Sequence, residues 1–394
     1  MSKLMTLNNI DYKNKQVFLR VDYNVVEEGK VIDEFRIEQS LPTIHQLLSN
    51  GCSVILASHN GRPEGRVVKE LSLQPVAQVL ADLLKKQVTF VDDCVGREVA
   101  EEAMSLEPGK ILLLENLRFH SAEEKNNIAF SKALASLAEV YVDDAFANAH
   151  RAHASMVGVP KFLPHAAGML MQKEYDMITH LMDVPQRPYM AVIGGVKISG
   201  KIEVLESLIK KVNILFIGGA MANTFLQAMG YKIGDSVTEQ DHVSTAKNLI
   251  AKAQANGVEL ILPTDVVVAK SPKSGVSHRT VGVSKIQNGE MALDIGKETM
   301  KNLIPKIKQS KTIFWNGTLG MAEIPEFAWA SRDLAHLMAL RKGRADTIIG
   351  GGDTTAFIEK LGMHNKYRFV STGGGASLEL LAGKKLPAIE ALKS

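Results

Sequence analysis

The chain contains 394 residues, of which 45% are hydrophobic and 23% are charged, and its formal net charge is +3. This composition is typical of a folded globular protein and excludes extensive disorder, and the length favours two domains over a single core. Lysines and arginines are scattered and form no basic run, which argues against nucleic acid as the main partner.

The sequence also bears on location. No apolar segment is long enough to cross a membrane, and residues 1–15 lack the apolar core of a signal peptide. The two cysteines, Cys52 and Cys94, occur in unrelated contexts, as is typical of proteins in a reducing compartment. We therefore expect a cytoplasmic protein with no membrane partner.

In the first half of the chain, short apolar runs end in polar and cationic residues. Runs at 17–21, 54–57, 111–114 and 140–142 have the character of buried strands, and amphipathic stretches such as 74–86 separate them. This alternation predicts a parallel sheet with crossover helices. The candidate binding residues in this half of the chain are Asp22, Tyr23, Asn24, Arg36, His59, Asn60, Gly61, Arg62, Arg118 and Arg151.

Arginines dominate this set. Guanidinium groups bind phosphate and carboxylate in a bidentate manner, so several arginines that converge on one small ligand indicate a multiply charged anion. The segment 59–63 is also compatible with a simple Asn-Gly turn. His150 and His153 have a spacing found in metal sites, but no third ligand has a diagnostic spacing, so we do not predict zinc there.

A boundary lies near the middle of the chain. Prolines at positions 160, 164, 185 and 188 flank a helix-like stretch over residues 166–182. We interpret this stretch as a helix that connects two domains.

In the second half, five apolar runs end in small or turn-forming residues. The runs cover residues 190–193, 214–217, 312–315, 347–349 and 369–370, and glycines follow each of them. Glycines let backbone N–H groups approach a ligand closely, and helix N-termini favour negative charge. The pattern therefore predicts a nucleotide-binding edge of an α/β sheet.

Residues 195–202 nearly match a phosphate-binding P-loop. Ile202 stands where that motif requires a hydroxyl for Mg²⁺, so we exclude a P-loop enzyme. Lys197 and Lys201 remain as a pair four residues apart, which we expect on one side of a first helical turn. A solvated helix face would have the same spacing, but the Gly-Gly pair at 194–195 favours phosphate binding.

Three glycines at 350–352 are followed by Asp353 and Thr354. The carboxylate of Asp353 could cap the following helix, reach a Mg²⁺ ion bound to nucleotide phosphates, or do both. The segment 371–377 is similar but has no acid, and predicts an amide-lined nest for an anion.

Together these motifs resemble those of the phosphoglycerate kinase family over essentially the whole chain. Each motif is weak evidence alone, but all of them occur in the family's order. The matching segments are residues 20–25, 58–63, 114–119, 144–146, 150–153, 194–197, 315–317, 350–354 and 371–377.

The resemblance implies an α/β fold with two Rossmann-like domains, each a parallel sheet flanked by helices. We expect a phosphoglycerate-binding domain over residues 1–165, an interdomain helix over 166–184 and a nucleotide-binding domain over 185–372. Residues 373–394 would form a hinge and a C-terminal segment that returns to the first domain. The resemblance also implies a monomer that closes by hinge bending.

The family reaction moves a phosphoryl group between 1,3-bisphosphoglycerate and MgADP and gives 3-phosphoglycerate and MgATP. The resemblance implies that Arg36 meets the carboxylate and the phosphoryl group in transfer, and that Asp22 and Asn24 hold the glycerate. The basic patch for the non-transferring phosphate would comprise His59, Arg62, Arg118 and Arg151.

For the nucleotide, the resemblance implies Lys201 on the phosphates, Glu323 on the ribose hydroxyls and Asp353 on Mg²⁺. Lys197 would stabilise the phosphoryl group in transfer, with help from the backbone N–H groups of Gly373 and Gly374. Further nucleotide contacts would come from Asn316, Gly350, Gly351, Gly352 and Thr354. We expect ADP or ATP with Mg²⁺ as the co-substrate and no tightly bound organic cofactor.

Several positions depart from the family pattern. Val26 stands where proline is usual and Asn60 where leucine is usual, and residues 147–148 replace a glycine and a small residue. Thr318 replaces a proline, and the phenylalanine usual before Glu323 is missing. No charged contact residue is lost, so we expect activity with altered nucleotide affinity or base preference.

Three other functions can be compared with this one. A phosphotransferase for another small acyl phosphate would not need the full cationic set, which indicates two charged ends on the substrate. A catalytically silent scaffold would be expected to lack Arg36, Lys197 or Asp353, and all three are present. An NAD-dependent dehydrogenase is excluded because no G-x-G-x-x-G turn follows the first strand.

Overall fold

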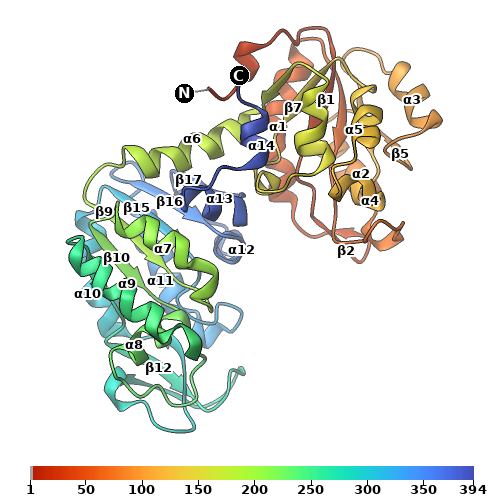
Figure 1. Cartoon of the computed structure of the whole chain (residues 1–394). Coiled ribbons are helices and arrows are strands. Elements are labelled where there is room, and N and C mark those ends of the chain that lie inside the picture. Colours follow the sequence, from red (N-terminus) through yellow and green to blue (C-terminus); the bar gives the residue numbers. More distant parts are fainter. Residues whose placement is uncertain (1–2) are drawn as a thin grey trace. The chain divides into compact units, whose positions relative to one another are not determined.

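The computed structural model describes residues 3–394, which form two compact units (Figure 1). Unit 1 comprises the residues up to Asp176 together with Lys385–Ser394, and unit 2 comprises Met177–Lys384. Helix α6 (Met169–Asp183) contributes residues to both units. Within residues 3–394, no helix combines the length and the apolar character needed to span a bilayer.

Unit 1 is built on a six-stranded parallel sheet with the strand order β5-β6-β4-β1-β7-β8. The strands are β1 (Gln16–Arg20), β4 (Ser53–Ala57), β5 (Val88–Val91), β6 (Ile111–Leu114), β7 (Val140–Asp143) and β8 (His165–Ala167). The helices are α1 (Glu34–Ser49), α2 (Gln74–Leu84), α3 (Arg97–Met104), α4 (Ser121–Glu124), α5 (Ile128–Ala135) and α14 (Pro387–Ala391). A short hairpin pairs β2 (Val26–Glu27) with β3 (Lys30–Val31).

Unit 2 contains a second six-stranded parallel sheet, ordered β11-β10-β9-β15-β16-β17, and a separate antiparallel sheet, β13-β12-β14. The parallel strands are β9 (Tyr189–Ile193), β10 (Ile214–Ile217), β11 (Glu259–Ile261), β15 (Thr312–Asn316), β16 (Asp346–Gly350) and β17 (Phe369–Val370). The antiparallel strands are β12 (Asp265–Ala269), β13 (His278–Gly282) and β14 (Met291–Ile295). The helices are α7 (Ile202–Ile209), α8 (Met221–Ala228), α9 (Val243–Ala255), α10 (Lys297–Gln309), α11 (Trp329–Ala339), α12 (Gly352–Lys360) and α13 (Gly374–Leu381).

The apolar runs of the sequence become strands that are buried on both faces. In β9, Met190 and Val192 pack in one hydrophobic cluster, whereas Ala191 and Ile193 pack in another on the opposite side. Successive side chains of a strand point to opposite faces, so a strand covered on both faces must be apolar throughout. The predicted architecture of parallel sheets flanked by helices is confirmed.

Two boundaries differ from the predicted ones. The connecting helix begins at Met169 and not at 166, because Ala166 and Ala167 belong to β8. The carboxylate of Asp144 accepts the first backbone N–H groups of the helix, those of Leu170 and Met171, at 2.8 and 3.0 Å. The final segment joins unit 1 from Lys385, later than residue 373, because α13 packs with the core of unit 2 through Leu381.

Candidate functional site

The carboxyl end of the unit 1 sheet holds a well-defined ion pair. Asp22 follows β1, and its Oδ2 lies 2.6 Å from Nη1 of Arg36 in the first turn of α1. Asp33 caps α1 by accepting the backbone N–H of Arg36, and its carboxylate lies 3.2 Å from Nε of the same arginine. The guanidinium of Arg36 is thus held between two carboxylates.

Arginines surround His59 at the same end of the sheet. Burial, and then the charges of Arg20, Arg118 and Arg151, lower the pKa of His59 well below its ordinary value. Burial and the neighbouring Arg151 also lower the pKa of Arg118 to about 10. His59 is therefore a neutral imidazole at physiological pH and adds no charge to the predicted basic patch, while the arginines create a positive potential that a bound anion would relieve.

Arg118 is positioned by backbone and side-chain contacts. Its Nη1 donates to the carbonyl of Gly61 at 2.7 Å, and its Nε lies 3.3 Å from Oε1 of Glu124. Asn24 accepts the N–H of Gly61 at 2.8 Å, which fixes the turn that carries that carbonyl. Nη2 of Arg118 and Nε of Arg151 are buried without a hydrogen-bond partner among residues 3–394. Such donors are costly unless a ligand supplies the acceptor.

Two predicted binding residues point into the protein. Tyr23 is fully buried, with its hydroxyl 2.8 Å from Oγ of Ser40, and burial raises its pKa. Asn60 is also buried, and its side chain accepts the N–H of Val26 at 3.1 Å and donates to the carbonyl of Val26 at 2.9 Å. Both residues stabilise the loops around the site, whereas Arg62 is exposed to solvent.

Sequence reasoning missed a buried support beneath the arginines. Nε of Arg20 donates to Oγ of Ser155 at 2.9 Å, and Ser155 in turn donates its hydroxyl and its backbone N–H to the carboxylate of Glu123, at 2.5 and 2.9 Å. All three residues are buried. The sequence did contain a sign of this support, because Arg20 ends an otherwise apolar strand and a buried charge needs a partner.

The surroundings of His153 oppose a metal ion there. Burial, followed by the charges of Arg118 and Arg20, lowers the pKa of His153 to about 3. His153 is therefore a neutral imidazole at physiological pH, beside arginines whose charges would repel a cation.

In unit 2, glycines allow three strand ends to pack closely. Gly194 donates its N–H to the carbonyl of Asn316 at 2.8 Å, and Gly219 donates to the carbonyl of Leu319 at 3.2 Å. Gly219 has a φ of +66°, and a Cβ atom there would lie 2.5 Å from the carbonyl oxygen of Gly195. A larger residue would separate the β9, β10 and β15 ends that form this edge.

The spacing of Lys197 and Lys201 predicts that they share a helical turn. The structure shows that they do not. Lys197 is exposed in the turn before the short 3₁₀ helix Ser199–Lys201, and α7 begins only at Ile202. Nζ of Lys201 donates to the carbonyl of Gly194 at 2.8 Å and to Oδ1 of Asn316 at 2.7 Å. Burial lowers the pKa of Lys201 to about 8, and Asp353 acts in the opposite direction.

The first turn of α12 carries Asp353 and Thr354. Gly351 is the N-cap of this helix, so Asp353 lies inside the first turn and the capping role considered for it is wrong. Its carboxylate is exposed, whereas the hydroxyl of Thr354 accepts the N–H of Gly317 at 2.6 Å. Nδ2 of Asn316 is buried and has no hydrogen-bond partner within the described chain. An oxygen-rich ligand would complete this donor set.

A cavity of about 380 Å³ opens at this edge. Asp353 and Glu323 both line it, and Leu293 and Met321 provide apolar walls. Leu293 comes from β14 in the antiparallel sheet, and sequence reasoning missed it because the glycine clusters mark only the parallel strands. The cavity therefore combines a polar end, with two carboxylates, and an apolar region.

In the segment at 371–377, some hydrogen-bonding groups already have partners within the segment itself. Gly373 is the N-cap of α13, and its N–H donates to Oγ of Ser371 at 3.0 Å. That hydroxyl also lies 2.8 Å from Oγ of Ser377. The N–H of Gly373 that was assigned to the phosphoryl group is thus engaged by Ser371, and Gly374 opens the helix with a φ of +50°.

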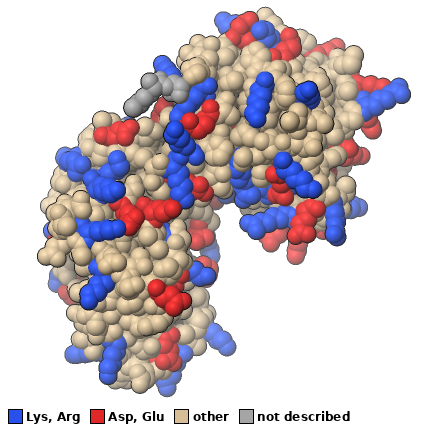
Figure 2. All heavy atoms as spheres, viewed as in Figure 1, with Lys and Arg blue, Asp and Glu red and all other residues tan. Residues whose placement is uncertain are grey.

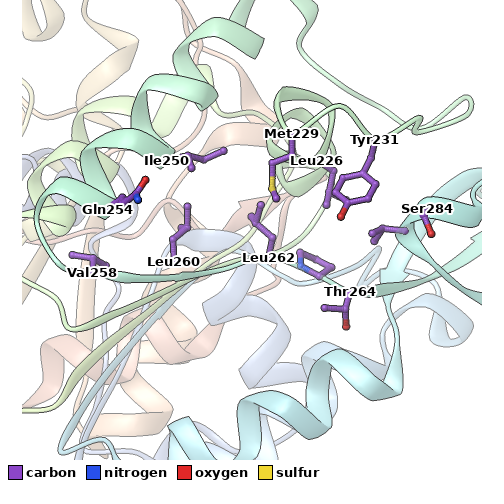
Figure 3. Close-up of a pocket in the computed structure, with 12 residues that line it drawn as sticks. Leu226, Met229, Tyr231, Ile250, Gln254, Val258, Leu260, Leu262, Thr264 and Ser284 are labelled. Carbon is purple, nitrogen blue, oxygen red and sulfur yellow. The ribbon is translucent and has the colours of Figure 1, made fainter.

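A second cavity in unit 2, of about 590 Å³, has a different character. Figure 3 shows Leu226, Met229, Ile250 and Leu260 pointing into it. Its described lining contains no charged side chain. We do not assign an anionic substrate to it.

The two units thus carry a cationic binding edge and a glycine-rich cavity with a free carboxylate. Basic and acidic side chains are mixed over the rest of the visible surface (Figure 2). Cations and backbone amides without a nucleophile are typical of an enzyme that transfers phosphoryl groups, because this chemistry depends on charge neutralisation and alignment. The fold and these sites indicate a two-domain α/β phosphotransferase.

Comparisons with known proteins identify the family. The family model for phosphoglycerate kinase matches residues 7–384. The phosphoglycerate kinase of Moorella thermoacetica is 50% identical over 393 residues, which cover 100% of this chain and 99% of that protein. The phosphoglycerate kinase of Gloeothece citriformis is 47% identical, with 99% and 98% covered.

Solved structures agree with these matches. The phosphoglycerate kinase structure from Coxiella burnetii has a TM-score of 0.88 and 39% identity, with 99% of both chains covered. The one from Pyrococcus horikoshii has a TM-score of 0.86 and 30% identity, with 99% of this chain and 98% of that chain covered. The chain belongs to the phosphoglycerate kinase family and is a phosphotransferase with ADP or ATP as co-substrate.

Proposed function

We propose that this enzyme transfers a phosphoryl group between 1,3-bisphosphoglycerate and MgADP, giving 3-phosphoglycerate and MgATP in glycolysis and gluconeogenesis. The observation that carries the proposal is the arginine cluster of unit 1, in a chain of this family, with buried guanidinium nitrogens that have no acceptor among residues 3–394. A substrate with a phosphate at one end and a carboxylate or acyl phosphate at the other would supply those acceptors.

In unit 1, we assign the non-transferring phosphate to Arg118 and Arg151. The neutral His59 would donate or accept a hydrogen bond and would not contribute charge. Arg36 would meet the reacting carboxylate, because its guanidinium already pairs with the carboxylate of Asp22 at 2.6 Å and can exchange that partner for the substrate. The exposed Arg62 would complete the patch once substrate is bound.

In unit 2, we assign the nucleotide to the cavity lined by Glu323 and Asp353. Asn316 and Lys201 would donate to phosphate oxygens, and Glu323 would accept from ribose hydroxyls. Mg²⁺ fits Asp353, since this ion commonly binds one or two carboxylates together with nucleotide phosphates. When bound, the ion would neutralise phosphate charge.

Lys197 would stabilise the phosphoryl group in transfer. It is exposed in a turn and has the reach of a flexible cation, so it can follow the reacting group. The leaving group from an acyl phosphate is a carboxylate, so no strong general acid is required. Neutralisation of the equatorial oxygens and in-line alignment supply most of the rate acceleration.

The proposal includes closure of the two units, because donor and acceptor bind to different units and must be brought into line while water is excluded. It also includes a monomeric, cytoplasmic enzyme. Cys52 and Cys94 are both buried free thiols, which supports a reducing compartment.

A coupled assay tests the proposal. Purified protein is given 3-phosphoglycerate and MgATP, and the product is consumed by glyceraldehyde-3-phosphate dehydrogenase while NADH loss is followed. We expect NADH oxidation that depends on phosphoglycerate and falls at least about 30-fold in kcat in Lys197→Ala, which corresponds to about 2 kcal/mol. Lys301→Ala is the matched control, since this lysine is exposed and pairs with Glu298 on the surface of α10.

The other outcomes separate the alternatives. Activity with acetate or another small carboxylate in place of phosphoglycerate would indicate a different phosphotransferase. Calorimetric binding of both ligands with no turnover would indicate a scaffold or a failure of closure.

A further inference from the structure

A cluster of sulfur, nitrogen and oxygen donors lies in unit 1, apart from the strand-end residues described above. It consists of Asp93 and Cys94, in the loop after β5, and His120, which follows the 3₁₀ helix Leu117–Phe119. One potential ligand atom from each residue lies within 4.8 Å of the other two. Figure 1 labels β5, α3 and α4, the elements that flank these two loops.

The carboxylate of Asp93 is the centre of the cluster. Its Oδ1 lies 2.7 Å from Nε2 of His120 and 2.6 Å from the backbone nitrogen of Cys94, whose N–H donates to it. The thiol of Cys94 also forms a hydrogen bond to Asp93. The Asp93 carboxylate is thus approached by both an imidazole and a thiol, with one ligand atom of each residue within 4.8 Å of the other two, and one cation could replace both proton-mediated contacts.

The scaffold holds these three groups in place. The carbonyl of Asp93 accepts the N–H of Glu115 at 3.3 Å, which ties the loop to the end of β6. The ring of His120 packs against Phe130 with ring centroids 5.3 Å apart. Cys94 is 1% exposed, whereas the side chains of Asp93 and His120 are 52% and 33% exposed. The cluster is therefore closed on the thiol side and open to solvent on the other, where water can complete a coordination shell.

The charges that act on the Cys94 thiol are negative, because the carboxylates of Asp93 and Glu123 lie near it. The charges that act on His153, in contrast, include those of Arg118, Arg20 and Arg151. A cation that binds a thiolate would displace the thiol proton to solvent.

We propose that Asp93, Cys94 and His120 form a binding site for a divalent cation of the zinc class, with water as a further ligand. Thiolate and imidazole select borderline-soft ions, whereas Mg²⁺ prefers oxygen ligands and keeps its waters. The site is therefore distinct in chemistry from the Mg²⁺ position proposed at Asp353. His120 is two residues from Arg118, so an occupied site would add positive charge beside the arginine cluster.

Cobalt and zinc titrations of the full chain test this proposal. The protein is first treated with a chelator, and Co²⁺ is then added in the presence of excess Mg²⁺. We expect a near-ultraviolet sulfur-to-cobalt charge-transfer band that saturates at a single ion per chain and is abolished in Cys94→Ser. Zn²⁺ competition against a chromophoric chelator should show at least about tenfold weaker binding in His120→Gln and Asp93→Asn.

Matched controls come from the same chain. Cys52→Ser removes the other buried thiol, and Asp92→Asn removes the exposed acid next to the cluster. Both variants should retain the cobalt band and the wild-type zinc affinity.

The proposal fails if the wild-type protein gives no sulfur-to-cobalt band, or if excess Mg²⁺ removes it. It also fails if a Cys94→Ser protein with wild-type circular dichroism retains full zinc affinity, since the cluster would then be only a hydrogen-bonded loop. If Cys94→Ser does not fold, the proposal is tested by the wild-type cobalt band and by the zinc affinity of His120→Gln.

Discussion

The candidate anion sites of the two units are built by different physical means. In unit 1 the candidate binding edge consists of long cationic side chains, such as Arg118, which is held by the backbone carbonyl of Gly61 and the exposed carboxylate of Glu124. In unit 2 the edge is mostly backbone, and glycines such as Gly219 let strand ends approach within distances that no side chain would allow. A small, highly charged substrate needs many full charges, whereas a nucleotide needs a shaped cavity with amides and one metal-binding carboxylate. The two units should therefore be sensitive to different substitutions.

The largest effect should come from adding a methyl group to the unit 2 edge. In Gly219→Ala the new Cβ would lie 2.5 Å from the carbonyl oxygen of Gly195 and 2.9 Å from that of Thr318. We expect a loss of about 4 kcal/mol or more in the free energy of unfolding, because backbone must shift and a positive φ is strained as well. Chemical denaturation measures this loss.

Gly257→Ala is the control for that substitution. Gly257 has a φ of +67°, nearly the same as Gly219, but no atom lies within 4 Å of its added Cβ. Gly257→Ala should lower the free energy of unfolding by only about 1 kcal/mol, which is the contribution of backbone conformation alone. Equal losses in the two variants would show that close packing of the strand ends is not what these glycines provide.

Buried charge in unit 1 should give a pH dependence of stability. Burial raises the pKa of Asp143 from 3.8 to about 7, and its Oδ2 has no hydrogen-bond partner among the described residues. Between these pH values the folded state holds a proton that the unfolded state has released. The free energy of unfolding therefore falls as pH rises from about 4 to about 7, and the whole loss is present above pH 7.

Asp143→Asn removes this cost and keeps an oxygen for the N–H of Ala145. The variant should be more stable than the wild type by about 3 kcal/mol at pH 8, and the gain should shrink toward pH 4. Denaturation at several pH values, with Asp92→Asn as an exposed control, measures it. A gain that does not change with pH would contradict the assigned titration.

Removing an arginine should affect catalysis more than folding. Arg36→Ala should lower kcat by at least about 30-fold, or about 2 kcal/mol, because its charge is needed at the reacting carboxylate. The coupled assay measures kcat. Arg97→Ala, which removes an exposed arginine paired with Glu101, should leave kcat unchanged. Unchanged turnover in both Arg36→Ala and Lys197→Ala would refute the proposed mechanism.

A smaller effect on stability should arise from the contact between Val26 and Asn60, two positions that depart from the family pattern. The N–H of Val26 is available to Asn60 only because residue 26 is not proline, and the two residues exchange two hydrogen bonds. We expect Asn60→Leu alone to be destabilising and Val26→Pro to relieve part of that loss in the double variant. A double-mutant cycle should give a coupling energy of about 1 kcal/mol, and a value near zero would show that the two positions vary independently.

The sequence was most informative where burial and turn chemistry act locally. Continuous apolar runs predicted strands such as β9, and the glycines after them predicted the binding edge. The charge state of His59 could not be predicted, because it depends on arginines distant in sequence. The wall provided by Leu293 and the hydrogen bonds of Asn60 also depend on tertiary contacts, and the capping alternative for Asp353 failed because a neighbouring glycine begins the helix.

The last ten residues of the chain, Lys385–Ser394, have a consequence for the order of folding. They complete unit 1: Leu392 and Ile389 are buried, the carbonyl of Leu392 accepts the N–H of Met5, and Ala388 donates its N–H to the carbonyl of Ala149. Unit 2 is continuous in sequence and can fold as soon as it leaves the ribosome. Unit 1 begins earlier in the sequence but lacks α14 until Lys385–Ser394 have been synthesised, so all of unit 2 is made before unit 1 can be completed.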